Sequence, residues 1–127
     1  MKLGIVGLGR MGANMARRLA RAGVEIVGFD TASSARALID GEANVRTADS
    51  MKALVAALPK PCMVWLMLPA GSVTQAAVDE LASLLASGDT IVDGGNAHYK
   101  DSQKRARMFS TRGIAFVDAG VSGGVWG

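Results

Sequence analysis

The 127-residue sequence predicts a single α/β domain built on a doubly wound parallel sheet. Two observations support this prediction. Apolar segments of strand length alternate with segments of helical periodicity along the chain, in the order β-α-β-α-β-α-β-α-β-α-β. The run Cys62 to Leu68 (CMVWLML) is apolar without alternation, which is typical of a strand in the middle of a parallel sheet that helices cover on both faces.

The first thirty residues form one strand, turn, helix and strand unit. A short apolar strand over residues 3–6 is followed by the pattern G-x-G-x-x-G. Gly7 allows the tight turn, Gly9 leaves room for a pyrophosphate, and Gly12 lets the helix pack close to the strand. The N–H groups and positive dipole end of that helix then face the phosphates. The apolar residues at helical spacing behind the turn are Met11, Met15, Ala16 and Leu19.

Asp30 ends the second strand of this unit, which runs from Glu25 to Asp30. It lies 18 residues beyond Gly12, close to the position of the acidic residue that accepts hydrogen bonds from the adenosine ribose. Its charge repels a 2′-phosphate, and residues 31–33 (TAS) contain no arginine. Arg36 is the nearest cation, but it is expected on the next helix, too far along to be an obvious phosphate clamp. The unit therefore predicts a dinucleotide site that favours NAD over NADP. The alternative to a dinucleotide site is a glycine turn that has only a packing role.

The remaining elements follow from turn and capping residues. After the second strand, they are a helix from Ser33 to about Asp40 closed by Gly41, a strand from Val45 to Thr47, and a helix capped by Asp49 or Ser50 that runs through about Ala57. The strand Cys62 to Leu68 follows Pro59 and Pro61, and a helix capped by Ser72 follows the break at Pro69 to Gly71. The last elements are a strand from Thr90 to Asp93, a polar, basic helix from Tyr99 to about Thr111, and a strand from Ile114 to Val121.

Composition points away from several classes of protein. The net charge of +3 comes from scattered basic residues with one local cluster at Arg17, Arg18 and Arg21, so no nucleic-acid partner is predicted. No segment reaches membrane-spanning length, and neither a membrane partner nor a metal site is predicted. The single cysteine, Cys62, excludes an intramolecular disulfide and is expected to be a small buried apolar residue. A cytoplasmic location fits these features.

The loops after the strands share a composition suited to ligands. They read GLGRMG, LPAG, DGGN and VSGG, and a short D-T turn follows the second strand. Ligands of such sheets bind beyond the carboxyl ends of the strands, where glycine lets backbone approach them. The need for turn-forming residues would explain the composition of any one of these loops. Five such loops at the ends of strands favour a ligand-binding edge of the sheet.

These loops carry a family resemblance. GLGRMGANMARRL, MLPAG, DGGNAHYKDS and FVDAGVSGGVWG together resemble the N-terminal part of the decarboxylating 6-phosphogluconate dehydrogenases, within the β-hydroxyacid dehydrogenase superfamily. DGGN discriminates them from hydroxyisobutyrate-type relatives, which usually carry a serine- and threonine-rich version there. Asp30 and GGVWG resemble the shorter, NAD-using form. A 3-hydroxyisobutyrate-type domain remains the alternative.

The resemblance assigns site residues in a Rossmann-type NAD(P)-binding fold over residues 1–127. By resemblance, the pyrophosphate and nicotinamide side is lined by Gly9, Arg10 and Met11, the adenosine ribose by Asp30, and the middle of the cofactor by Leu68, Pro69 and Ala70. The resemblance also implies that Asn96 lies between nicotinamide and substrate, and that the hydroxyacid substrate is contacted by Ser122, Gly123 and Gly124. For Asn96, an Asx-turn or a helix N-cap ahead of Tyr99 is an alternative role that is compatible with binding.

The resemblance also implies a reaction. It is the oxidation of 6-phosphogluconate by hydride transfer to NAD and the loss of CO₂, giving ribulose 5-phosphate in the pentose phosphate pathway and gluconate utilisation. The family's catalytic lysine and glutamate lie downstream of VSGG, so no catalytic residue is expected within residues 1–127, and His98 is expected at the surface or in a cap. By the same resemblance, the helical substrate and dimerisation domain of a homo-oligomer is expected to lie outside residues 1–127, so these residues alone are expected to be inactive. A dinucleotide sensor without chemistry is a second alternative, disfavoured by the substrate-type loops.

Overall fold

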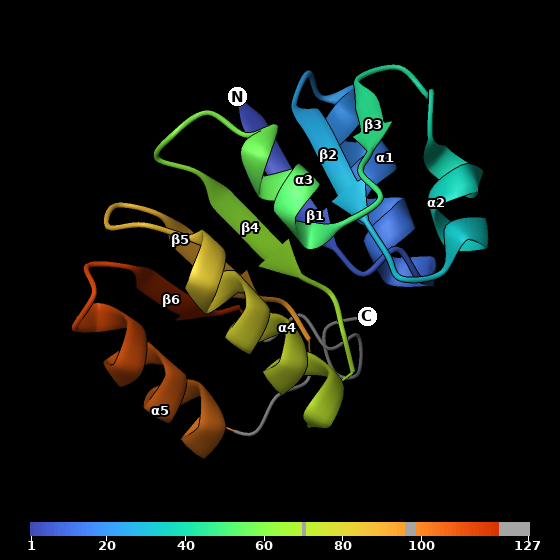
Figure 1. Ribbon diagram of the computed structural model, residues 1–127. Coiled ribbons are helices and arrows are strands. Elements are labelled where there is room, and N and C mark those ends of the chain that lie inside the picture. Colours follow the sequence, from blue (N-terminus) through green and yellow to red (C-terminus); the bar gives the residue numbers. More distant parts are fainter. Residues whose placement is uncertain (70, 96–98, 120–127) are drawn as a thin grey trace.

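A computed structural model of the chain, which describes residues 1–69, 71–95 and 99–119, confirms the predicted sheet. Its six strands are all parallel and lie in the order β3-β2-β1-β4-β5-β6 (Figure 1). The strands are β1 (Lys2–Val6), β2 (Glu25–Phe29), β3 (Val45–Thr47), β4 (Met63–Leu66), β5 (Thr90–Asp93) and β6 (Ala115–Asp118). The helices are α1 (Arg10–Arg21), α2 (Ser33–Ile39), α3 (Met51–Ala56), α4 (Ser72–Leu84) and α5 (Tyr99–Ser110).

The helices form a layer on each face of the sheet. The chain starts at the middle strand β1, moves outward to β3, and returns to build β4, β5 and β6 on the other side of β1. Because crossovers between parallel strands are right-handed, this reversal places α1 and α2 behind the sheet in Figure 1 and α3, α4 and α5 in front of it. The order of strands reverses between β1 and β4, so their carboxyl ends form the edge where such folds bind ligands.

Two apolar cores separate the sheet from its helices. The core behind the sheet contains Leu3, Ile5 and Ile26 packed against Ala16 of α1 and Ile39 of α2. The larger core in front joins the strands to α3, α4 and α5, and its buried residues include Val64, Leu66, Leu54, Val78, Leu81 and Phe109. Alternate residues of β4 therefore face different cores, which confirms that this strand lies in the middle of the sheet.

Several element boundaries differ from the predicted ones. Strand β4 spans Met63–Leu66 and not Cys62 to Leu68, because its partner β5 offers only four residues, from Thr90 to Asp93, to pair with it. The residue at the N-cap of α4 is Gly71, with φ of 94°, and Ser72 is the first residue of the helix and not its cap. Ser50 does cap α3, because its Oγ accepts a hydrogen bond of 3.0 Å from the Ala53 N–H.

A buried carboxylate ties together the amino ends of β4 and β5. Asp89 is 1% exposed and accepts hydrogen bonds of 2.8 Å from the Cys62 and Ala86 N–H groups and of 3.0 Å from Lys60 Nζ. Burial alone would raise the pKa of Asp89, but these donors outweigh it and lower the pKa below its usual value. Cys62 is buried as expected, and burial raises the pKa of its thiol.

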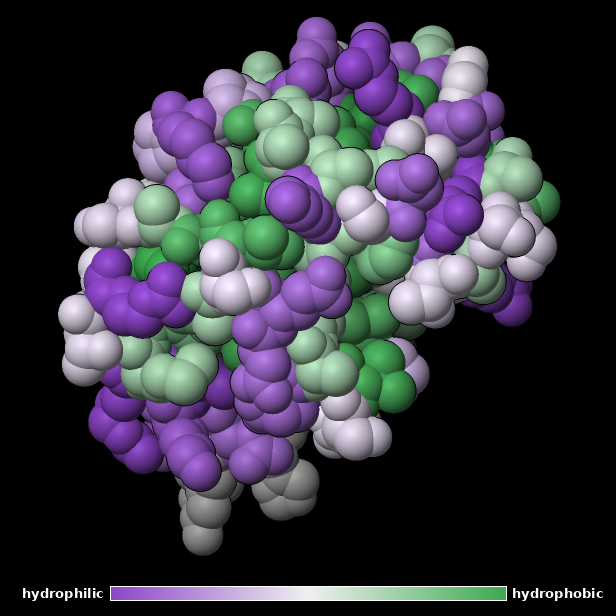
Figure 2. Space-filling model, in the orientation of Figure 1, coloured by the Kyte–Doolittle hydropathy of each residue, from purple (hydrophilic) through white to green (hydrophobic). Residues whose placement is uncertain are grey.

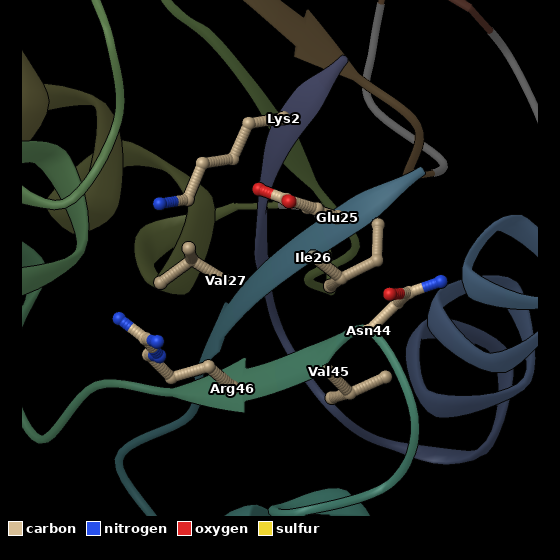
Figure 3. Close-up of a pocket in the computed structure, with 7 residues that line it drawn as sticks. All are labelled: Lys2, Glu25, Ile26, Val27, Asn44, Val45 and Arg46. Carbon is tan, nitrogen blue, oxygen red and sulfur yellow. The ribbon is translucent and has the colours of Figure 1, made fainter. Parts of the chain in front are cut away.

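The surface in front of the sheet is mixed in character. Hydrophilic residues gather over α5, and apolar surface shows between α3 and α4 (Figure 2). A shallow pocket opens at the amino ends of β1, β2 and β3, where Lys2, Glu25 and Arg46 contribute side chains (Figure 3). This pocket lies at the opposite end of the strands from the glycine loop. Within the described residues, no helix is long and apolar enough to cross a membrane.

Candidate dinucleotide-binding site

The glycine loop turns tightly between β1 and α1. Gly7 has φ of 99°, and its N–H donates a 2.8 Å hydrogen bond to the Phe29 carbonyl oxygen, which fixes the loop to the end of β2. A side chain at Gly7 would collide with the Met67 carbonyl oxygen. A side chain at Gly12 would overlap the Gly7 carbonyl oxygen, because α1 packs directly on the turn. These two glycines are therefore required by the backbone itself.

Gly9 differs from its neighbours in the loop because it faces open space. A Cβ there would meet no atom of the described residues within 4 Å, and the φ of −66° at Gly9 suits any residue. Gly9 is the N-cap of α1, which has no acidic residue in its first turn and, among the described residues, no side-chain cap hydrogen bond. The first N–H groups of this 12-residue helix thus lack a side-chain cap there, which suits the binding of an anionic group.

Arg10 and Met11 are exposed residues in the first turn of α1. Met11 is 50% exposed, so its place in the helical apolar pattern does not put it in the core. It lines a groove with Met15, Trp65 and Met67, on the side of α1 that faces β4. Both residues are therefore accessible to a ligand that runs along the glycine loop.

Asp30 stands beside the same loop, directly after β2. Its Oδ2 accepts a 2.8 Å hydrogen bond from the Leu8 N–H, and its Oδ1 accepts a 2.9 Å hydrogen bond from the Ala32 N–H. The carboxylate therefore links the glycine loop to the turn before α2. Each oxygen accepts a single backbone N–H in these contacts, so it retains a lone pair for a ribose hydroxyl.

An apolar slot extends from the glycine loop and Asp30 toward α4. It has a volume of about 450 Å³, within the range of small-molecule sites. Its walls include Phe29 at the end of β2, Met51 of α3, and Leu68 after β4. The lining residues from α4 include Val73, Ala76, Ala77 and Glu80. A flat heteroaromatic ring would find apolar walls here with Asp30 at one end.

The loops after β4 and β5 pack against each other at the same edge. The Gly94 N–H donates to the Leu66 carbonyl oxygen at 2.8 Å, and a side chain at Gly95 would collide with the Leu68 carbonyl oxygen. Pro69 is exposed, and its carbonyl oxygen accepts a 2.6 Å hydrogen bond from Thr74 Oγ1 in the first turn of α4. Leu68 and Pro69 are thus held by backbone contacts at the edge where the glycine loop lies.

Asp93, at the start of the DGGN sequence, is fully buried. Its Oδ1 accepts a 3.0 Å hydrogen bond from the Gly95 N–H, whereas no hydrogen-bond donor reaches Oδ2 among the described residues. Burial, and to a smaller degree the charge of Asp118 on β6, raises the pKa of Asp93. The countercharge of Asp93 is Arg105 of α5, whose Nη1 lies 3.9 Å from Asp93 Oδ2. The sequence did not indicate this pair.

Arg105 connects α5 to two other elements. It is only 5% exposed, and its Nε and Nη2 donate hydrogen bonds of 3.1 and 2.9 Å to Gln75 Oε1 on α4. A polar, basic helix was predicted here, and a buried arginine within it leaves no signal in hydropathy. The spacing that could have revealed it is Ser102, Arg105 and Phe109 on one face, all three of which are buried.

Five predicted site residues lie outside the described residues: Ala70, Asn96, Ser122, Gly123 and Gly124. His98 does as well. The structure brings together the others, Gly7, Gly9, Arg10, Met11, Gly12, Asp30, Leu68 and Pro69, at the carboxyl ends of β1, β2 and β4. The space over Gly9, the uncapped start of α1, the Asp30 carboxylate and the apolar slot together fit a dinucleotide.

Comparison with known proteins gives a consistent picture. A family model described as the NAD-binding domain of 6-phosphogluconate dehydrogenase matches residues 2–127. A relative from Haloferax volcanii, named as an NAD⁺-dependent, decarboxylating 6-phosphogluconate dehydrogenase, is 42% identical over 124 residues. That alignment covers 98% of this chain and 40% of the relative, so the chain spans well under half of that protein's length.

Solved structures show the same fold. A Plasmodium falciparum 6-phosphogluconate dehydrogenase superposes with a TM-score of 0.84 at 23% identity, over 91% of this chain and 26% of that one. A Mycobacterium tuberculosis 3-hydroxyisobutyrate dehydrogenase superposes with a TM-score of 0.81 at 25% identity, over 92% of this chain and 39% of that one.

Proposed function

The chain belongs to the family of NAD-binding domains of 6-phosphogluconate dehydrogenase, and on that premise we propose that it is the NAD-binding part of a decarboxylating phosphogluconate dehydrogenase. A dinucleotide cofactor follows from the family. The observation that best supports the choice of NAD over NADP is the carboxylate of Asp30, which backbone N–H groups hold in place after β2. We call this part of the site, where the adenosine ribose would bind, the ribose corner. A 2′-phosphate placed there would meet a negative charge, whereas two ribose hydroxyls would meet acceptors.

Each part of the site contributes to holding the cofactor. The open space over Gly9 admits the pyrophosphate to the N–H groups of α1, and the apolar slot receives the adenine. When bound, the nicotinamide supplies the hydride acceptor for oxidation of a secondary alcohol. Leu68 and Pro69 support the middle of the cofactor. Gly95, packed on the Leu68 backbone, fixes the start of the loop that leads to Asn96, which we propose as a contact of both nicotinamide and substrate.

The substrate and the complete reaction belong to a longer protein in this proposal. We propose 6-phosphogluconate as the substrate, with Ser122, Gly123 and Gly124 as contacts, and a downstream lysine and glutamate as the catalytic groups. The Haloferax relative carries that substrate in its name and is longer than this chain. Residues 1–127 form one domain of a homo-oligomeric, cytoplasmic enzyme in this reading. A 3-hydroxyisobutyrate-type dehydrogenase is the second candidate because of its similar fold, but DGGN favours phosphogluconate.

Calorimetry of the 127-residue chain tests the cofactor proposal. NAD is expected to bind at least about tenfold more tightly than NADP, because the repulsion between the Asp30 carboxylate and the 2′-phosphate of NADP is worth about 1.4 kcal/mol or more at a partly buried site. Asp30→Ala should narrow the difference, because it weakens NAD by removing the acceptor for the ribose hydroxyls and also removes the charge that repels the phosphate of NADP. Part of that loss will reflect the Leu8 and Ala32 N–H groups, which the substitution leaves without their acceptor. A smaller dissociation constant for NADP than for NAD in the unmodified chain would refute the assignment.

A further inference from the structure

The corner around Asp30 holds a cation as well as a carboxylate. Arg36 extends from α2 back toward the end of β2, and its Nη1 donates a 2.8 Å hydrogen bond to the main-chain oxygen of Asp30. The contact is partly buried. It uses only one of the several N–H donors that a guanidinium carries in its planar fork. Arg36 lies on the helix after β2, as expected, but its guanidinium reaches back to the end of that strand, closer than its position in the sequence suggested.

Arg36 reaches the corner because of how α2 begins. Asp30 Oδ1 accepts from the Ala32 N–H, which turns the chain into the helix that starts at Ser33. Arg36 lies one helical turn from that start, so its long side chain can point back toward the turn. The same carboxylate that would bind ribose hydroxyls thus sets the position of a positively charged side chain beside it.

A second arginine nearby provides a contrast. Arg36 and Arg46 line one pocket together with Thr47 and Asp49. Arg46 is paired with Val27 on β2, three residues before Asp30. At a rise of about 3.3 Å per residue this puts its backbone roughly 10 Å from the ribose corner. Among the residues that the structure describes, Arg36 is the cation that contacts Asp30 through a hydrogen bond.

We propose that Arg36 is a cofactor-specificity residue able to bind the 2′-phosphate of an NADP-type dinucleotide, and that the Asp30 carboxylate is what prevents it from doing so. This inference rests on the proposed dinucleotide function. A phosphate entering the corner of the native chain meets the negative charge of Asp30 before it gains hydrogen bonds from Arg36. With a neutral side chain at position 30, the guanidinium would form charge-assisted hydrogen bonds to the phosphate.

The test compares variants at positions 30, 36 and 46 by calorimetry. The ligands are NAD, NADP, AMP and adenosine 2′,5′-bisphosphate, the last two isolating the ribose corner from the rest of the cofactor. Asp30→Asn is expected to tighten NADP by about tenfold, and Asp30→Asn/Arg36→Met to lose that gain, since a charge-assisted contact to phosphate contributes a factor of about ten or more. Asp30→Asn/Arg46→Met is the matched control and should keep the gain.

The outcomes separate this inference from the function on which it rests. If the native chain binds neither NAD nor AMP, the dinucleotide proposal itself fails. If NAD binds and the NADP gain of Asp30→Asn survives removal of Arg36, or disappears equally with Arg46→Met, only the role of Arg36 is overturned. Thermal unfolding checks each variant. Should Asp30→Asn not fold, because its amide N–H₂ opposes a backbone donor, Asp30→Ser gives the same comparison with and without Arg36.

Discussion

At the scale of single residues, a substitution at Gly9 is expected to impair dinucleotide binding without impairing folding. Gly9→Val is expected to fold and to lose dinucleotide affinity by about a hundredfold or more, because the side chain would occupy the approach of the pyrophosphate to the N–H groups of α1. The free energy of unfolding should fall by no more than about 1 kcal/mol, since Gly9 has an extended backbone and open space around it. Calorimetry with NAD and thermal unfolding measure the two effects.

Gly12→Val provides the matched control. Its side chain would overlap the Gly7 carbonyl oxygen, so this variant should lose stability and binding together. A folded Gly9→Val protein with native affinity for NAD would refute the role of the glycine loop.

The residue scale also shows what sequence reasoning can reach. The separate roles of Gly7, Gly9 and Gly12 were predictable because each depends on local backbone geometry that spacing encodes, and the structure bears out the tight turn and the close packing. The reach of Arg36 was not predictable, because a long side chain can point along several directions from one helical position. Its direction is set by the Asp30 carbonyl, a partner six residues earlier in the chain.

At the scale of elements, Arg105 holds α5 against α4 and the end of β5. Arg105→Met is expected to lower the free energy of unfolding by about 2–3 kcal/mol at pH 7, because it removes the countercharge of a buried carboxylate and its own bonds to Gln75. The 3.9 Å separation from Asp93 favours the lower part of the range seen for buried pairs. Urea unfolding measures the loss, and Arg107→Met, an exposed position on the same helix, is the control.

The loss from Arg105→Met should also depend on pH. The folded-state pKa of Asp93 is raised, so the folded state binds its proton more readily than the unfolded state does. The charged carboxylate therefore lowers stability above that folded-state pKa, and the penalty disappears as pH falls below the unfolded-state value near 4. Arg105→Met should thus cost less at about pH 4 than at pH 7. Equal losses at both pH values would contradict the pairing of Arg105 with Asp93.

Element boundaries were less predictable than element order. The order of helices and strands followed from periodicity, whereas the length of β4 depended on the four residues of β5 that pair with it. The cap of α4 at Gly71 depended on a positive φ that composition alone does not distinguish from a simple turn. Ser50, by contrast, caps α3 through its own side chain, which is why the sequence could indicate it.

At the scale of the whole molecule, the 127-residue chain is expected to show no turnover of 6-phosphogluconate with NAD. Hydride transfer needs a base within roughly 2.6–3.2 Å of the substrate hydroxyl. Asp93 is the carboxylate closest in sequence to Asn96, and it is fully buried and bonded to Gly95. The same residues joined to a downstream segment of the length found in the relatives should produce NADH.

Absorbance of NADH at saturating substrate measures this difference. Production of NADH by the purified 127-residue chain, abolished by Asn96→Ala, would show that a base within these residues is competent. Variants of His98 and Lys100 would then identify that base.

The hydrogen bonds that Asp89 accepts from Cys62, Ala86 and Lys60 affect how such a protein can evolve. It secures the strands β4 and β5 at the edge opposite the glycine loop, with bonds that involve no residue of the proposed site. We therefore expect substitutions at that edge to change thermal stability without changing the choice of cofactor. Stability and cofactor choice could then evolve separately, at opposite edges of one sheet.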